Sequence, residues 1–181
     1  MVLKMVNYTV SNVQANHTIS AEFELMTINI NLANSSYVGK VKIRYKFGSG
    51  TWTNITNPTV QGTTVTVPSG NPTMTVEAYD IDEAYTFHQW QIYTGGQGPA
   101  ISQNPYEFTS QMVSGIVGIE LSLTAKTAYT ITATAGTGGT ISPSGSVTVY
   151  AGDDKTFQVT PNSGYRIKSV KLDGSPIEPD S

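Results

Sequence analysis

Cysteine is absent from the chain, and charged side chains are scarce. The first absence excludes disulfides and thiolate chemistry, but it leaves the compartment open because exported proteins need not contain cysteine. Charged residues make up 13% of the sequence and the formal net charge is −3, so no basic field is offered to nucleic acid or to anionic lipid. No apolar run reaches transmembrane length, and we expect no membrane span.

The composition that remains is typical of β-structure, because Thr, Val, Ile, Gly and Tyr are frequent while Leu and Ala are few. In the last third of the chain, apolar and polar residues alternate with period two in four short segments separated by turn residues. These predicted strands are YTITAT (129–134), SVTVYA (146–151), TFQVTP (156–161) and YRIKSVKLDG (165–174). After residue 174 the strand signal stops in a polar tail. A sheet that ended there would expose an unpaired edge and an uncovered apolar face.

The first 24 residues carry the same alternation. A strand over 8–13, a turn over 14–17 and a second strand over 18–23 predict a hairpin spanning residues 5–24. Its expected inward side chains are Tyr8, Val10, Val13, Ile19, Ala21 and Phe23.

Three stretches together resemble one family. They are YTITATAGTGGTISPSGSVTV, TFQVTPNSGYRIKSVKLDG and YTVSNVQANHTISAEF, and they look like the divergent InlB B-repeat, a small all-β module found in tandem on bacterial and archaeal surface proteins. In that family the third stretch follows the second, whereas here it precedes it by a whole domain. The resemblance therefore implies that the last third of one module comes first in this chain, and the first two thirds of another come last.

The middle of the chain is predicted to be a further β-domain, with strands over 27–31, 41–47, 51–55, 64–68, 73–79, 85–93, 106–111 and 116–125. The loop over 94–104 is the stretch expected to be least ordered. Residues 65–90 resemble residues 147–170, which places Tyr85 on Tyr165, Phe87 on Ile167 and Trp90 on Val170, and predicts that Trp90 is buried. The region over 26–64 departs from the family pattern.

The predicted fold class is thus all-β, built from tandem small β-sandwich or β-grasp-like modules in an elongated array. The expected parts are a donor hairpin (1–24), a complete middle domain (25–127) and an incomplete C-terminal module (128–181).

Residues able to support catalysis or to bind a metal are few. His17 and His88 have no acidic residue at triad or ligand spacing, which favours structural roles. Asp80, Asp82 and Glu83 crowd one turn and could hold a hard cation, although a solvated turn is favoured. We predict no catalytic residue, no metal and no cofactor. Trp52 and Trp90 could form a sugar-stacking platform, but aromatic residues on strands more often belong to a core.

Four Asn-x-Ser/Thr sequons lie in the first third of the chain, at Asn7, Asn16, Asn34 and Asn54. They favour an N-glycosylated extracellular protein. Chance occurrence in a Thr-rich sequence is the alternative.

The split module predicts self-assembly. The hairpin could close its own chain's C-terminal module, dock into the next subunit, or belong to a longer tandem array. The absence of a flexible linker favours the last two. We expect an extracellular, non-enzymatic structural protein whose subunits join head to tail into a fibre. The donor side chains should pack on Ile131, Val149, Phe157, Ile167 and Val170. The alternatives are a stalk or adhesin segment that binds a glycan or receptor, and an accessory domain of a secreted glycoside hydrolase.

Overall fold

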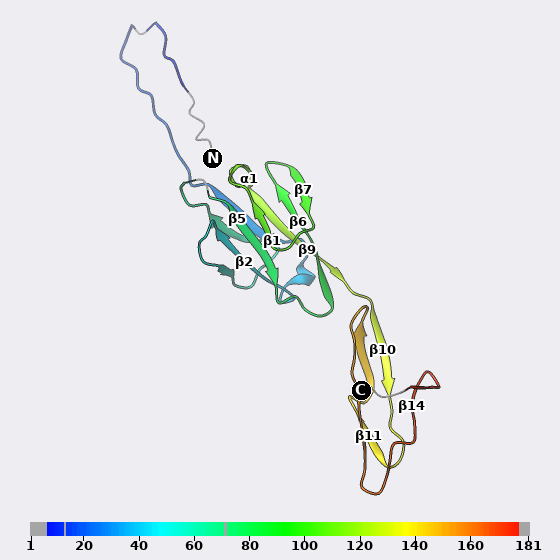
Figure 1. The fold of residues 1–181 in the computed structure, drawn as a ribbon. Coiled ribbons are helices and arrows are strands. Elements are labelled where there is room, and N and C mark those ends of the chain that lie inside the picture. Colours follow the sequence, from blue (N-terminus) through cyan, green and yellow to red (C-terminus); the bar gives the residue numbers. More distant parts are fainter. Residues whose placement is uncertain (1–6, 13, 71, 178–181) are drawn as a thin grey trace. The chain divides into compact units, whose positions relative to one another are not determined.

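The computed structural model describes residues 7–12, 14–70 and 72–177, and in them the protein is all-β (Figure 1). The described residues form fifteen strands, one short 3-10 helix, η1 (Ser35–Tyr37), and one turn of α-helix, α1 (Ser110–Val113). Within the described ranges, no helix is long and apolar enough to cross a membrane. The chain divides into two compact units, Met1–Ala125 and Lys126–Ser181.

The larger unit is a sandwich of two sheets. In the five-stranded sheet the order is β4 (Thr63–Thr66), β1 (Thr27–Leu32), β9 (Gly118–Ala125), β6 (Tyr85–Tyr93) and β7 (Gln97–Ile101). In the four-stranded sheet it is β3 (Thr53–Ile55), β2 (Lys42–Phe47), β5 (Met74–Tyr79) and β8 (Tyr106–Phe108).

One strand pair in the larger unit is parallel. β1 runs beside β9 with Asn29 level with Gly118 and Leu32 level with Leu121, whereas the other paired strands run antiparallel. Because the two neighbours run in the same direction, β1 begins at one end of the sheet and β9 ends at the other.

Period-two alternation builds the core between the two sheets. The inward positions of β1, β9 and β6 meet those of β2, β5 and β8, and the buried set includes Ile28, Ile30, Leu32, Ile43, Met74, Val76, Trp90, Ile92, Phe108, Ile119 and Leu121. Trp90 is 0% exposed, which confirms its predicted burial.

A β-bulge alters the expected facing of the neighbouring aromatic residue. The register of β6 against β9 shifts between Phe87 and Gln89. Strict alternation would put Phe87 and Trp90 on opposite faces, but the extra residue brings both to the core side, where their ring centroids are 5.7 Å apart.

The structure corrects a predicted strand end and a predicted loop in the larger unit. The strand over 106–111 ends at Phe108, because the side chain of Thr109 accepts a hydrogen bond from the Met112 N–H and caps α1. The stretch expected to be least ordered contains β7, which pairs with β6. There the buried Gln91 amide donates to the Gly98 carbonyl at 2.7 Å and fixes the strand to its neighbour.

The C-terminal unit consists of three two-stranded antiparallel sheets. β10 (Ala128–Ala133) pairs with β12 (Gly145–Tyr150), β11 (Gly139–Ser142) with β13 (Gln158–Pro161), and β14 (Val170–Leu172) with β15 (Ser175–Ile177).

The end of this unit differs from the prediction in two ways. The expected strand over 165–174 is reduced to β14, and residues 165–169 carry no strand. The polar tail does contain a strand, β15. Asp173 and Gly174 both have positive φ (49° and 82°), which is the type I′ turn that closes a two-residue hairpin.

The N-terminal segment, residues 7–25, carries no strand in its described residues and runs out and back as an extended loop (Figure 1). The predicted hairpin pairing was therefore wrong for the single chain. Two strands alone are marginally stable in water, and the described apolar side chains of this segment are exposed rather than packed on a further strand. Val13, one of the expected donor residues, lies outside the described residues.

Candidate assembly site

The C-terminal unit buries almost none of its apolar side chains. Among its described residues Ala133, 7% exposed, is the single buried position. Of the five predicted acceptor residues, Ile131, Val149, Phe157 and Val170 are only half-buried, and Ile167 is 49% exposed. The alternation that fills the core of the larger unit is present here, but the described residues of this unit leave its apolar side chains largely uncovered.

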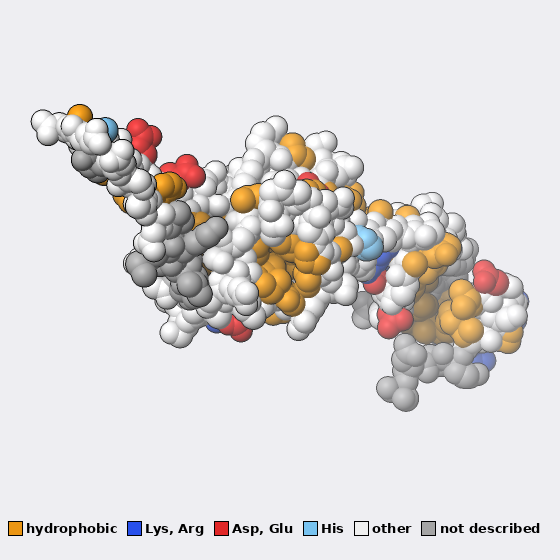
Figure 2. All heavy atoms as spheres, turned by 90° about the horizontal axis from the view of Figure 1, so that it is seen from above, with side chains coloured by type: hydrophobic (Ala, Val, Ile, Leu, Met, Phe, Trp, Pro, Cys, Tyr) orange, Lys and Arg blue, Asp and Glu red, His pale blue; other side chains and the backbone are white. Residues whose placement is uncertain are grey.

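Further apolar side chains of this unit face solvent and were not among the predicted acceptor residues: Tyr129, Tyr165, Leu172 and Ile177. Figure 2 shows hydrophobic side chains gathered on the surface of this unit. Tyr165 could have been identified from its match to Tyr85 in the middle domain.

The N-terminal segment presents the complementary pattern. Its predicted donor residues Tyr8, Val10, Ile19 and Phe23 are all exposed, and Phe23 is 94% exposed. Leu25, at 75% exposed, continues the alternation of Ile19 and Phe23 and lies one residue past the predicted hairpin. Two sets of apolar side chains with strand spacing are thus uncovered at opposite ends of the same chain.

The two uncovered regions also carry exposed side chains of opposite charge. Glu22 and Glu24 are exposed on the N-terminal segment, while Arg166, Lys168 and Lys171 are exposed near the end of the C-terminal unit. The acidic residues alternate with the apolar ones in sequence, so the two sets would lie on opposite faces if the segment formed a strand.

In the acidic turn of the larger unit, Asp80 and Asp82 each form an ion pair with a lysine. Asp82 accepts a hydrogen bond from Lys40 Nζ at 2.8 Å and another from the Ala84 N–H, and both lower the pKa of its carboxyl group. Asp80 pairs with Lys42 at 2.6 Å. In the described parts of the chain, no three His, Cys, Asp or Glu side chains gather as a metal site would require.

The proposed sugar-stacking platform loses one of its two tryptophans, because Trp90 is buried. Trp52 is half-buried on the four-stranded sheet, where the Arg44 guanidinium lies 4.5 Å from its ring centroid and the Lys46 ammonium 5.2 Å. Arg44 also pairs with Glu77 at 2.6 Å. Two cationic side chains therefore already lie against the Trp52 ring, on which a sugar would have to stack.

The four sequon asparagines, Asn7, Asn16, Asn34 and Asn54, are all exposed. Asn34 uses its side-chain oxygen to accept from the Ser36 N–H at the start of η1, and Asn54 accepts from the Tyr79 hydroxyl. In both cases the side-chain oxygen makes the hydrogen bond, whereas a glycan is attached to the amide nitrogen.

Comparison with protein families supports the resemblance in the C-terminal unit. Residues 129–180 match the model of the divergent InlB B-repeat domain, a repeat type of cell-surface proteins. A search of curated proteins and a search of solved structures each found no match.

Proposed function

We propose that this protein is a structural, non-enzymatic component of the cell exterior whose copies join head to tail into a filament. In each junction the N-terminal segment of one copy adds strands to the C-terminal unit of the next. The observation that carries this proposal is the exposure of apolar side chains at both ends of the chain. One buried residue among those described is too small a core to stabilise the C-terminal unit, and the N-terminal segment carries apolar side chains that could cover it.

The course of the chain through the larger unit favours a second copy over closure within one molecule. The N-terminal segment leads directly into β1 at Thr27, and the C-terminal unit follows directly after β9 at Ala125. From the parallel register, these two points lie nine strand positions apart along the sheet, or roughly 30 Å. One leg of the segment is only about that long. If it ran back along the sandwich, it would end near the start of the C-terminal unit and could not also pair with that unit.

The proposal is tested by deleting residues 1–24 and imaging the purified protein by negative-stain electron microscopy. The full chain should form filaments and the truncated chain should not. A synthetic peptide of residues 5–25 should stop the growth of full-length filaments by capping the open unit. Replacing Ile19 and Phe23 with Asp should act like the truncation, whereas Asn16→Asp, in the turn, should not. A full chain that stays monomeric at every concentration would overturn the proposal.

We further propose an extracellular location with N-linked glycans on the exposed sequons. Intact mass spectrometry of native material should show added mass at Asn7, Asn16, Asn34 or Asn54, and none at Asn57, which is followed by proline. The bare polypeptide mass would contradict this assignment.

A stalk or adhesin segment is the second candidate, because the match at residues 129–180 is to a repeat type. Binding on a glycan array that Trp52→Ala abolishes would favour it.

A further inference from the structure

Two strands complete the sandwich of the larger unit. β9 lies between β1 and β6 in the five-stranded sheet, and β8 pairs with β5 in the four-stranded sheet. Although they are consecutive strands, they belong to different sheets and do not pair with each other. Without them, the remaining pairs would be β1–β4, β2–β5 with β3, and β6–β7.

The C-terminal unit repeats those pairs. β10–β12 corresponds to β1–β4, β11–β13 to β2–β5, and β14–β15 to β6–β7, all antiparallel and in the same order along the chain. The registers agree with the sequence likeness between the units: Ile28 is level with Val65, and Ile131 is level with Val147, which aligns with Val65. Among its described residues the C-terminal unit has no counterpart of β8 or β9.

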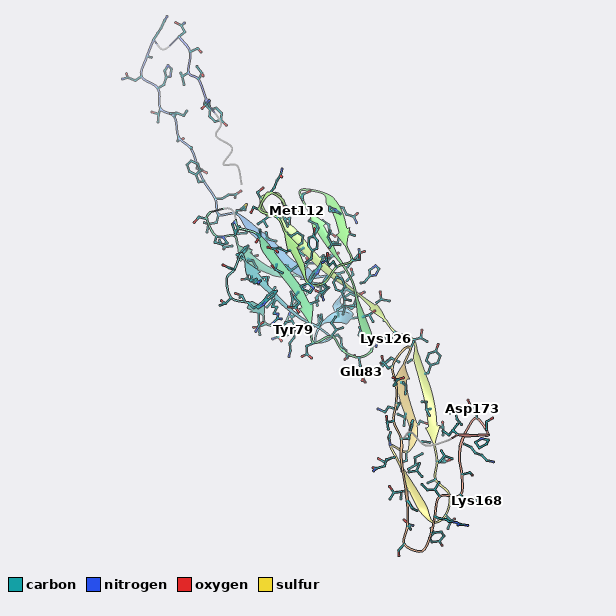
Figure 3. The ribbon with its side chains drawn as sticks, in the orientation of Figure 1. Tyr79, Glu83, Met112, Lys126, Lys168 and Asp173 are labelled. Atoms are coloured by element: carbon teal, nitrogen blue, oxygen red, sulfur yellow. The ribbon has the colours of Figure 1, made fainter. Side chains whose placement is uncertain are left out.

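A missing stretch of strand marks the place of the absent β9. In the larger unit, residues 85–89 of β6 pair with β9 alone, because β7 pairs with β6 only from Trp90 onward. The matching residues 165–169 carry no strand, and Tyr165 and Ile167 are exposed. Lys168, labelled in Figure 3, lies in this stretch. Residues 85–89 pair only with β9, and residues 165–169, which match them, lack strand structure. We therefore expect the strand that replaces β9 to pair with residues 165–169.

We propose, on the basis of the proposed function, that the two legs of the N-terminal segment of a second copy take the places of β8 and β9 in separate sheets. Residues 18–25 run parallel to β10 and antiparallel to residues 165–172, between the two, and they convert 165–169 into strand. Residues 8–12 pair antiparallel with β13. The segment is therefore inserted as two strands rather than docked as a hairpin, which agrees with the absence of pairing between its legs.

The larger unit gives the register. Ile119, Leu121 and Leu123 of β9 are buried, and Ile19, Ala21 and Phe23 reproduce their spacing. By this correspondence Ile19 lies beside Leu172 and Ala133, and Phe23 beside Ile167. If TMTV (73–76) of β5 is matched to TFQV (156–159) at β13, and Tyr106 and Phe108 to Tyr8 and Val10, then Val10 lies beside Phe157 and Tyr8 beside Val159.

The charges between the apolar positions fit the same register. Thr124 of β9 is level with Thr86 of β6, and the counterpart pair is Glu24 with Arg166. Opposite charges placed directly across two strands attract, while like charges repel. A shift of one residue would both break this pair and turn the apolar side chains outward.

Cysteine cross-linking tests the placement in the full chain, which has no cysteine of its own. The first double variant is Ser20→Cys with Lys171→Cys. Ser20 matches Glu120 of β9 and Lys171 matches Gln91 of β6, and Glu120 and Gln91 lie directly opposite each other in the larger unit. This variant should give a ladder of covalent oligomers on oxidation. The control pair, Ser20→Cys with Gln158→Cys, tests β13 in the other sheet and should give none. On assembly, amides 165–169 should also lose most of their deuterium uptake.

Charge reversal provides an independent readout. Glu24→Arg should slow filament growth, and adding Arg166→Glu should restore it. Filaments that cross-link only through Gln158, or that leave residues 165–169 unprotected, would overturn the strand placement while the proposed function stands. Absence of filaments in the unmodified chain would overturn both.

Discussion

Trp90 is the largest fully buried side chain, and its indole Nε1 is buried without a hydrogen-bond partner in the described residues. We predict that Trp90→Ala lowers the free energy of unfolding of the larger unit by about 3–5 kcal/mol, because it leaves a cavity between the sheets. Chemical denaturation followed by circular dichroism measures this. Trp52→Ala, at a half-buried position beside Arg44, is the matched control and should cost less. Equal losses for the two variants would place Trp90 outside the core.

Asp82 gives the larger unit a dependence on pH. Hydrogen bonds from Lys40 and from the Ala84 N–H favour the charged carboxylate, so the pKa of Asp82 is lower in the folded protein than in the unfolded chain. The stabilisation that Asp82 contributes is fully present above its pKa in the unfolded chain. It is lost as pH falls through its lower pKa in the folded protein. Asp82→Asn should therefore reduce stability at neutral pH and flatten its decline below about pH 4. The same decline in both proteins, measured by thermal melting across pH, would contradict this.

The β14–β15 hairpin depends on its two-residue turn. Gly174 has φ of 82°, where a side chain is strained, so Gly174→Ala should destabilise the hairpin by about 1–2 kcal/mol. Hydrogen exchange of residues 170–177 provides the measurement. Gly136 is a suitable control, since a methyl group there meets nothing within 4 Å and its φ is not positive. Gly136→Ala should leave the exchange of these residues unchanged.

Period-two alternation predicts strands wherever a face is half-buried, which is why β1, β2, β5, β6 and β9 follow their predicted ranges closely. It fails where backbone geometry rather than burial decides. The bulge beside His88 has no apolar signature, and the polar β15 exists because Asp173-Gly174 turns the chain back onto β14. The Asp-Gly pair favours a type I′ turn and so could have predicted this hairpin, whereas a reading of apolar alternation alone misses it.

The candidate site was predictable in its residues but not in its arrangement. The uncovered donor and acceptor positions follow from the apolar spacing of Ile19 and Phe23 and of Ile131 and Ile167. That consecutive strands enter different sheets cannot be read from spacing, because pairing over long separations is set by the whole sandwich. β8 and β9, connected through α1, supply that information.

At the scale of the whole molecule, the two units should differ in stability. A protein lacking residues 1–24 should unfold in two steps in calorimetry, with the sparsely buried C-terminal unit melting first. In filaments of the full chain the first step should move to higher temperature, because a bound segment stabilises only the folded unit. A single transition in the truncated protein would show that the C-terminal unit is complete without a donor.

The parallel neighbours β1 and β9 have a mechanical consequence. In a head-to-tail thread, tension enters each sandwich through Thr27 and leaves through Ala125, and these points lie at opposite ends of adjacent parallel strands. Such a pull slides the two strands lengthwise past each other, so the hydrogen bonds from Asn29 to Leu32 are loaded together instead of opening one after another. If the proposed filament forms, its sandwiches would be loaded in shear, the direction in which many hydrogen bonds must break at once.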